Sequence, residues 1–96
     1  MSRLEKIRLK RSKIISIAKS YGASNIRVFG SVARKEERRT SDVDFLVALE
    51  PGRSAFELGG LLMDLEELLG CHVDLVTDKG LSPLIRDAVL KEAVNL

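Results

Sequence analysis

The chain has 96 residues, of which 45% are hydrophobic and 31% are charged. This composition is that of one globular domain, so we expect a single unit, residues 1–96, and exclude a disordered or fibrous protein. The net charge of only +2 does not indicate a nucleic-acid-binding surface. No apolar run approaches the roughly 20 residues that span a bilayer, and the basic start lacks the long apolar segment of a secretion signal. We therefore expect a cytoplasmic protein that is not bound to a membrane.

The first half of the chain predicts a helix, a strand, a short helical turn and a second strand. Apolar residues between positions 4 and 21 recur at spacings of three, four and seven, which predicts an amphipathic helix from about Arg3 to Ser20. The run "NIRVF" (25–29) is short, β-branched and aromatic, as in a strand. One helical turn can follow at 31–34, and "DVDFLVAL" (42–49) has the pattern of a central strand.

The second half predicts two helices around a third strand. Ser54 and Glu57 have the spacing of a capping box before a leucine-rich helix that ends at Gly70. The third strand is "CHVDLVT" (71–77), and Ser82 with Pro83 marks the start of the last helix. We expect the apolar face of that helix to consist of Leu84, Ile85, Ala88 and Val89. The long helix between the second and third strands predicts an α/β (α+β) fold with a mixed or parallel sheet and a right-handed crossover.

Two aspartates flank one valine at the start of the second predicted strand. Residues two apart in a strand point to the same face, so Asp42 and Asp44 can direct both carboxylates at one point, while Val43 and Phe45 face the core. Two such charges about 5 Å apart repel by roughly 3 kcal/mol at an effective dielectric constant near 20. A divalent cation offsets this repulsion, and oxygen ligands without His or Cys favour Mg²⁺ or Mn²⁺.

Asp74 extends the candidate metal site. It lies in a similar alternation, "HVDLV", and reaches the same point if the second and third strands are neighbours. Three carboxylates around one or two cations form the two-metal arrangement of phosphoryl and nucleotidyl transfer. For any one of these aspartates alone, a strand cap or a surface acid is the better interpretation. The three together, in register with the turn described next, favour the metal site.

Gly30 and Ser31 follow the first predicted strand. Glycine permits a tight turn and the close approach of a ligand. If a helical turn begins here, its N–H groups and the Ser31 hydroxyl form an anion site suited to a triphosphate. Alone, such a pair is usually only a turn. The basic residues of "RKEERR" (34–39) leave two interpretations open, namely contact with phosphate and a solvated loop of mixed charge.

The stretch "GSVARKEERRTSDVDFLV" (30–47) resembles the signature of the DNA polymerase beta superfamily of nucleotidyltransferases. It aligns without gaps to the pattern Gly-Ser-x-Ala-Arg-Gly-Glu, four residues, Ser-Asp-x-Asp, of the small stand-alone MNT (minimal nucleotidyltransferase) proteins. With the later "HVDLVT", the resemblance covers essentially the whole chain. Lys35 stands where the pattern has glycine, which would suit a left-handed turn, so the loop departs from the pattern at this residue.

The resemblance implies a small mixed sheet with helices packed on one side. It further implies that Gly30 and Ser31 hold a nucleoside triphosphate, that Asp42 and Asp44 bind metal ions, and that Asp74 is the third metal-binding carboxylate and helps to activate the acceptor hydroxyl. The cofactor implied is Mg²⁺, as two ions, with Mn²⁺ as a substitute. Many MNT proteins resemble the antitoxin of a two-gene pair, in which AMP is moved from ATP to a tyrosine of a HEPN-domain ribonuclease toxin.

We therefore expect a Mg²⁺-dependent adenylyltransferase that acts on a HEPN-type protein partner. A polynucleotide is not expected as the direct substrate, because few residues follow Asp74 in this chain to form a further binding domain. Two alternatives remain open. One is a binding module that neutralises its partner by contact while its site is idle, and the other is a small-molecule nucleotidyltransferase that works as a homo-oligomer. The intact set of three acids favours catalysis.

Overall fold

A mixed four-stranded sheet forms the centre of the computed structural model, which describes residues 1–38 and 41–96. The helices in these ranges are α1 (Arg3–Leu9), α2 (Arg11–Ser20), α3 (Gly30–Ala33), α4 (Ala55–Leu69) and α5 (Pro83–Glu92), with a short 3₁₀ helix, η1, at Asp78–Gly80. The strands are β1 (Ala23–Phe29), β2 (Val43–Leu49), β3 (Val73–Thr77) and β4 (Val94–Asn95). In the described ranges, no helix combines the length and the apolar character needed to cross a bilayer.

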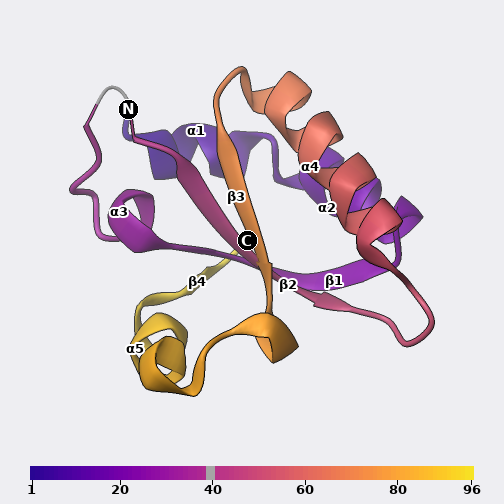
Figure 1. The fold of residues 1–96 in the computed structure, drawn as a ribbon. Helices are drawn as coiled ribbons and strands as arrows, with labels where there is room; N and C mark the ends of the chain where they lie inside the picture. Colours follow the sequence, from indigo (N-terminus) through magenta and orange to yellow (C-terminus); the bar gives the residue numbers. More distant parts are fainter. Residues whose placement is uncertain (39–40) are drawn as a thin grey trace.

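The strand order is β3-β2-β1-β4. β2 pairs in parallel with β3 through the α4 crossover, and it pairs antiparallel with β1, which in turn pairs antiparallel with β4. α1, α2 and α4 lie together on one side of the strands, and α5 lies on the other side (Figure 1). The predicted mixed sheet with a helical crossover is confirmed, and α5 adds a partial cover to the second face.

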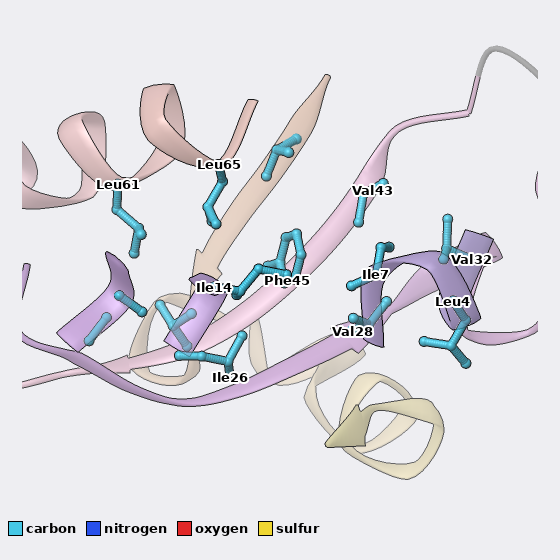
Figure 2. Packing of buried hydrophobic residues seen from close by; sticks show 14 residues of the cluster. Leu4, Ile7, Ile14, Ile26, Val28, Val32, Val43, Phe45, Leu61 and Leu65 are labelled. Carbon is cyan, nitrogen blue, oxygen red and sulfur yellow. The ribbon is translucent and has the colours of Figure 1, made fainter. Parts of the chain in front are cut away.

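The alternation of β2 divides the core between the two faces of the sheet. Val43 and Phe45 are fully buried in the larger cluster, beneath α1, α2 and α4 (Figure 2). Val47 is a buried member of the same cluster. Leu46 points the other way and packs with Val89 of α5 in a smaller cluster. Each such side chain stabilises the fold by roughly 1.5–3 kcal/mol when fully buried. Asp44 shares the face of Leu46, so α5 and the candidate site lie on the same side of the sheet.

The prediction of one helix from Arg3 to Ser20 is wrong at Lys10, where the chain divides into α1 and α2. The Lys10 N–H bonds to the Ile7 carbonyl at 3.0 Å, and its ammonium donates to the Leu68 carbonyl at 3.0 Å, near the end of α4. A cation is favourable at the C-terminal end of a helix, so this tertiary contact favours the break. Ile15, one of the apolar residues between positions 4 and 21 on which that helix was predicted, is 41% exposed.

Two adjacent glycines in α4 have different surroundings. A Cβ at Gly60 would lie 2.5 Å from the ring of Tyr21, so the glycine permits α2 and α4 to pack closely at this point. A Cβ at Gly59 would meet nothing within 4 Å. The structure assigns close packing to Gly60 and a weak point to Gly59.

The predicted apolar face of α5 is largely wrong. Leu84 is 95% exposed and Ile85 is 51% exposed, whereas Val89 is buried. The helix packs on the sheet through Val89 and Leu90 in its C-terminal half, and Leu84 and Ile85 in its first turns are not members of that cluster. The sequence also did not predict β4, which is only two residues long and pairs with β1.

Candidate active site

Neighbouring parallel strands bring two of the three predicted carboxylates together. Asp44 of β2 and Asp74 of β3 are direct partners in the parallel register, and the Asp74 carboxyl is one of the causes that raise the pKa of Asp44. Asp42 lies immediately before β2 and is exposed. The expected adjacency of the second and third strands, on which the interpretation of Asp74 depended, is therefore present.

The Asp44 carboxyl has a raised pKa, and the other acids of this cluster contribute to it. Burial raises its pKa from the usual 3.8 to about 6, and the hydrogen bond to Asp74 and the charges of Asp74, Asp42 and Glu92 act in the same direction. Partial burial disfavours the ionised form, and neighbouring anions add to this effect. A cation placed here would relieve the repulsion; the sequence predicted such a cation between Asp42 and Asp44, and that remains a prediction.

Gly30 presses directly against Asp44. It has a left-handed φ of 73° where β1 passes into α3, and Phe29, just before it, is the partner of Asp44 in the antiparallel register. A Cβ at Gly30 would lie only 2.1 Å from Asp44 Oδ2, so this position requires glycine for space as well as for its backbone conformation. Ser31 follows in α3, the helical turn that the sequence allowed. The turn and the carboxylate thus form one surface.

The loop after α3 keeps a left-handed turn although it lacks the expected glycine. Lys35 itself has φ 59°, and the Glu36 N–H donates to the Ser31 carbonyl at 2.9 Å. A left-handed conformation costs a non-glycine residue roughly 1–2 kcal/mol. The departure from the family pattern at Lys35 therefore changes the energy of the loop, while the turn is retained.

The basic residues of the loop have different surroundings. Arg34 pairs with Glu92 at 2.9 Å and with Glu36 at 3.2 Å, so carboxylates already surround its guanidinium. The Arg38 backbone N–H donates to the Ser41 hydroxyl at 2.8 Å, which closes the loop ahead of Asp42. Arg39, the last basic residue of "RKEERR", lies outside the described residues. Arg34 thus serves an internal ion pair in this structure.

Glu92 is the residue of this region that sequence analysis missed. Its Oε1 accepts the Gly30 N–H at 2.8 Å and its Oε2 accepts from Arg34 at 2.9 Å. The one signal in the sequence is a carboxylate in the last turn of a predicted helix, where the helix dipole disfavours a negative charge. That signal is weak, and it does not indicate which residues Glu92 contacts.

The carboxylates fit a magnesium ion by their chemistry. Within residues 1–38 and 41–96, no three Asp, Glu, His or Cys side chains already converge so that they could hold a metal by themselves. Mg²⁺ is typically bound by one or two carboxylates together with substrate phosphates, rather than by a cage made only of protein atoms. The paired Asp44 and Asp74 match that arrangement, and Asp42 lies just before β2.

Comparisons with known proteins agree with this geometry. A nucleotidyltransferase domain model matches residues 5–96. The chain is 43% identical over 84 residues to a Methanocaldococcus jannaschii protein named "Putative protein adenylyltransferase MJ0435", with 88% of this chain and 90% of that protein covered.

Two solved structures share the fold. One, described as a "putative minimal nucleotidyltransferase", has 47% identity and a TM-score of 0.88, with 100% of this chain and 97% of that chain covered. A chain of the complex between tri-AMPylated Shewanella oneidensis HEPN toxin and MNT antitoxin has 22% identity and a TM-score of 0.69, with 92% of this chain and 69% of that chain covered, and shows likeness of fold alone. The turn at Gly30, the paired aspartates of β2 and β3 and the match over nearly the whole chain together show that this protein belongs to the nucleotidyltransferase domain family, among its minimal members.

Proposed function

We propose that this chain transfers AMP from ATP to a tyrosine hydroxyl of a HEPN-type ribonuclease toxin and acts as the antitoxin of that partner in the cytoplasm. The observation that carries the proposal is the pairing of Asp44 with Asp74 against the turn at Gly30. Support comes from the name of the Methanocaldococcus jannaschii relative, which is that of a protein adenylyltransferase. The Shewanella oneidensis complex, in which an MNT antitoxin accompanies an AMPylated HEPN toxin, shows that this fold occurs in such a pair.

In the proposed reaction the acceptor oxygen attacks the α-phosphorus of ATP. The bond from the α-phosphorus to the bridging oxygen of the leaving pyrophosphate breaks, and AMP remains on the acceptor. Asp74 lies exposed at the edge of the cluster and accepts the hydroxyl proton, while Gly30 and Ser31 hold the triphosphate. Positioning and charge neutralisation provide most of the catalysis in such transfers.

Mg²⁺, held by Asp42, Asp44 and Asp74 together with the phosphates of ATP, would neutralise the charge that develops on the attacking and leaving oxygens. Two ions are proposed, and Mn²⁺ is expected to substitute because it favours the same oxygen ligands. In the absence of a cation the three carboxylates repel one another. Mg²⁺ with ATP should therefore raise the melting temperature of the protein by preferential binding to the folded state.

The test is the intact mass of the HEPN-type protein encoded beside this chain, before and after incubation with this chain, Mg²⁺ and ATP. We expect a gain of one or more AMP units, which is lost when Asp42 and Asp44 are both replaced by Asn. Asp87→Asn provides a matched control, because this aspartate is exposed on α5. Neutralisation of the toxin by the double variant, without a change in mass, would reject the enzymatic function in favour of binding alone. Label transferred to a small molecule without a partner would reject the protein acceptor.

A further inference from the structure

Glu92 connects the last helix to the turn of the candidate site. One carboxylate oxygen accepts the Gly30 backbone N–H at 2.8 Å, and the other accepts from the Arg34 guanidinium at 2.9 Å. The two partners are the first residue and the C-cap of the short helix α3, and Glu92 is 62 residues from Gly30 along the chain. A single side chain therefore fixes both ends of α3 relative to α5.

The position of Glu92 is poorly explained by the stability of α5 alone. A negative charge in the last turn of a helix opposes the helix dipole. The ion pair with Arg34 is partly open to solvent, with 44% of the Arg34 side chain and 27% of the Glu92 side chain exposed, and such pairs stabilise proteins only weakly. The hydrogen bond to Gly30 differs from the ion pair in its donor, which is the backbone N–H of the first residue of α3, so this bond holds the main chain of the turn and not a flexible side chain.

Glu92 is connected to the candidate site through Gly30, which lies against Asp44. Gly30 lies so close to Asp44 that an added Cβ would be 2.1 Å from the carboxylate oxygen Oδ2. Any displacement of the turn therefore changes the space in which Asp44 and a triphosphate can lie. Displacements of about 1 Å can lower catalytic rates by about 100-fold.

We infer that Glu92 is a positioning residue for nucleotidyl transfer, which holds the turn at Gly30, and through it the triphosphate site, against the carboxylate of Asp44. It touches neither the acceptor nor the reacting phosphate. The inference rests on the proposed use of Gly30 and Ser31 as the triphosphate site. It adds a function for α5, whose last residue, distant from Gly30 in sequence, holds the turn of the candidate site.

Two substitutions separate the contacts of Glu92. In Glu92→Gln the side-chain carbonyl can still accept the Gly30 N–H, whereas the amide NH₂ cannot pair with Arg34. In Glu92→Ala both contacts are lost. Ser82→Ala is the matched control, because it removes the side chain that caps the start of α5 and destabilises the same helix without touching the turn.

The experiment measures kcat and KM for ATP, the melting temperature and the NMR shift of the Gly30 amide in all variants. We expect Glu92→Ala to lower kcat/KM by about 100-fold, Glu92→Gln to remain within about threefold of wild type because only the exposed ion pair is lost, and Ser82→Ala to lower the melting temperature alone. The Gly30 amide shift should change in Glu92→Ala and stay near its wild-type value in Glu92→Gln.

Three outcomes would overturn the inference. Wild-type kcat/KM in Glu92→Ala would show that the turn does not need the contact. A lower KM for ATP in Glu92→Ala would show that the carboxylate competes with the nucleotide instead of positioning its site. Equal losses in Glu92→Ala and Glu92→Gln would show that the negative charge, and not the bond to Gly30, is what matters. Inactivity of the wild-type protein would instead count against the proposed function, and the Gly30 amide shift would then still report whether Glu92 holds the turn.

Discussion

Replacing Gly30 with alanine tests whether the turn and the Asp44 carboxylate form one site. The new Cβ would lie 2.1 Å from Asp44 Oδ2, whereas ordinary contacts begin near 3.4 Å, so the carboxylate must move by more than about 1 Å. The left-handed φ of 73° adds a backbone cost of roughly 1–2 kcal/mol to the free energy of folding. We expect Gly30→Ala to lose both stability and, because a 1 Å displacement suffices, about 100-fold in kcat.

Gly70→Ala is the control for the backbone cost. Gly70 caps α4 with a similar φ of 67°, and a Cβ there would meet nothing within 4 Å. This variant should therefore lose about the same 1–2 kcal/mol while it keeps wild-type activity. The difference in activity between the two variants then measures the displacement of Asp44 alone.

The assay combines initial rates of AMP transfer, measured by intact mass of the partner protein, with urea unfolding of each variant. Rates are measured well below the unfolding transition, so that the fraction of folded protein is the same in all samples. If Gly30→Ala transfers AMP as fast as Gly70→Ala at equal stability, the contact between the turn and Asp44 is not needed, and the reasoning fails.

The other predictions concern stability, measured by urea unfolding. Lys35→Gly should raise the free energy of unfolding by about 0.5–1 kcal/mol, because it relieves the left-handed lysine at φ 59°; no change would show that the loop relaxes freely. Gly59→Ala should raise the free energy of unfolding by about 1 kcal/mol. Gly60→Ala should lower the free energy of unfolding, because the added Cβ meets the ring of Tyr21 at 2.5 Å. Equal effects of the two substitutions would contradict the close packing of Gly60 on Tyr21. The folded Asp44 carboxyl keeps its proton up to a pKa of about 6, and the unfolded one only to 3.8, so stability is lost as pH rises between these values. Without divalent cations, Asp44→Asn should thus be more stable than wild type above pH 6. The expected difference in the free energy of unfolding is about 1 kcal/mol after allowance for solvent screening. A difference that persists below pH 4 would point to another cause.

Local patterns predicted much of the fold and the placement of the aspartates. Ser54 and Glu57 form the capping box that their spacing indicated, and Gly70 closes that helix in the left-handed conformation. The alternation around Asp44 and Asp74 placed both side chains on strands, and the crossover helix made those strands parallel neighbours. The capping and the alternation depend on residues close in sequence, so periodicity and capping rules suffice to predict them, whereas the sequence made the adjacency of the two strands only a condition for the role of Asp74.

The features that the sequence did not predict depend on contacts between distant residues. Lys10 breaks the first helix where its side chain reaches the end of α4, and nothing near Lys10 in the sequence indicates this contact. The apolar stripe of α5 satisfies the helical pattern, yet Leu84 is exposed and the helix packs on the sheet through Val89 and Leu90. Glu92 was overlooked because its partners are Arg34 and Gly30, which only the completed fold brings to it.

The contact between Glu92 and Gly30 also bears on how the protein becomes active during its synthesis. A ribosome makes Gly30 and all three aspartates before it reaches Glu92, which comes 62 residues after Gly30. Asp74, the last of the three aspartates, precedes Glu92 by 18 residues, so at roughly 5–20 residues per second all three exist for about 1–4 s before Glu92 is added. During that time the central strands exist while the turn lacks its carboxylate anchor and β1 lacks β4 along one edge. Nucleotide transfer should therefore begin only when translation of the last helix is complete, so a nascent chain has its catalytic residues before it has a working site.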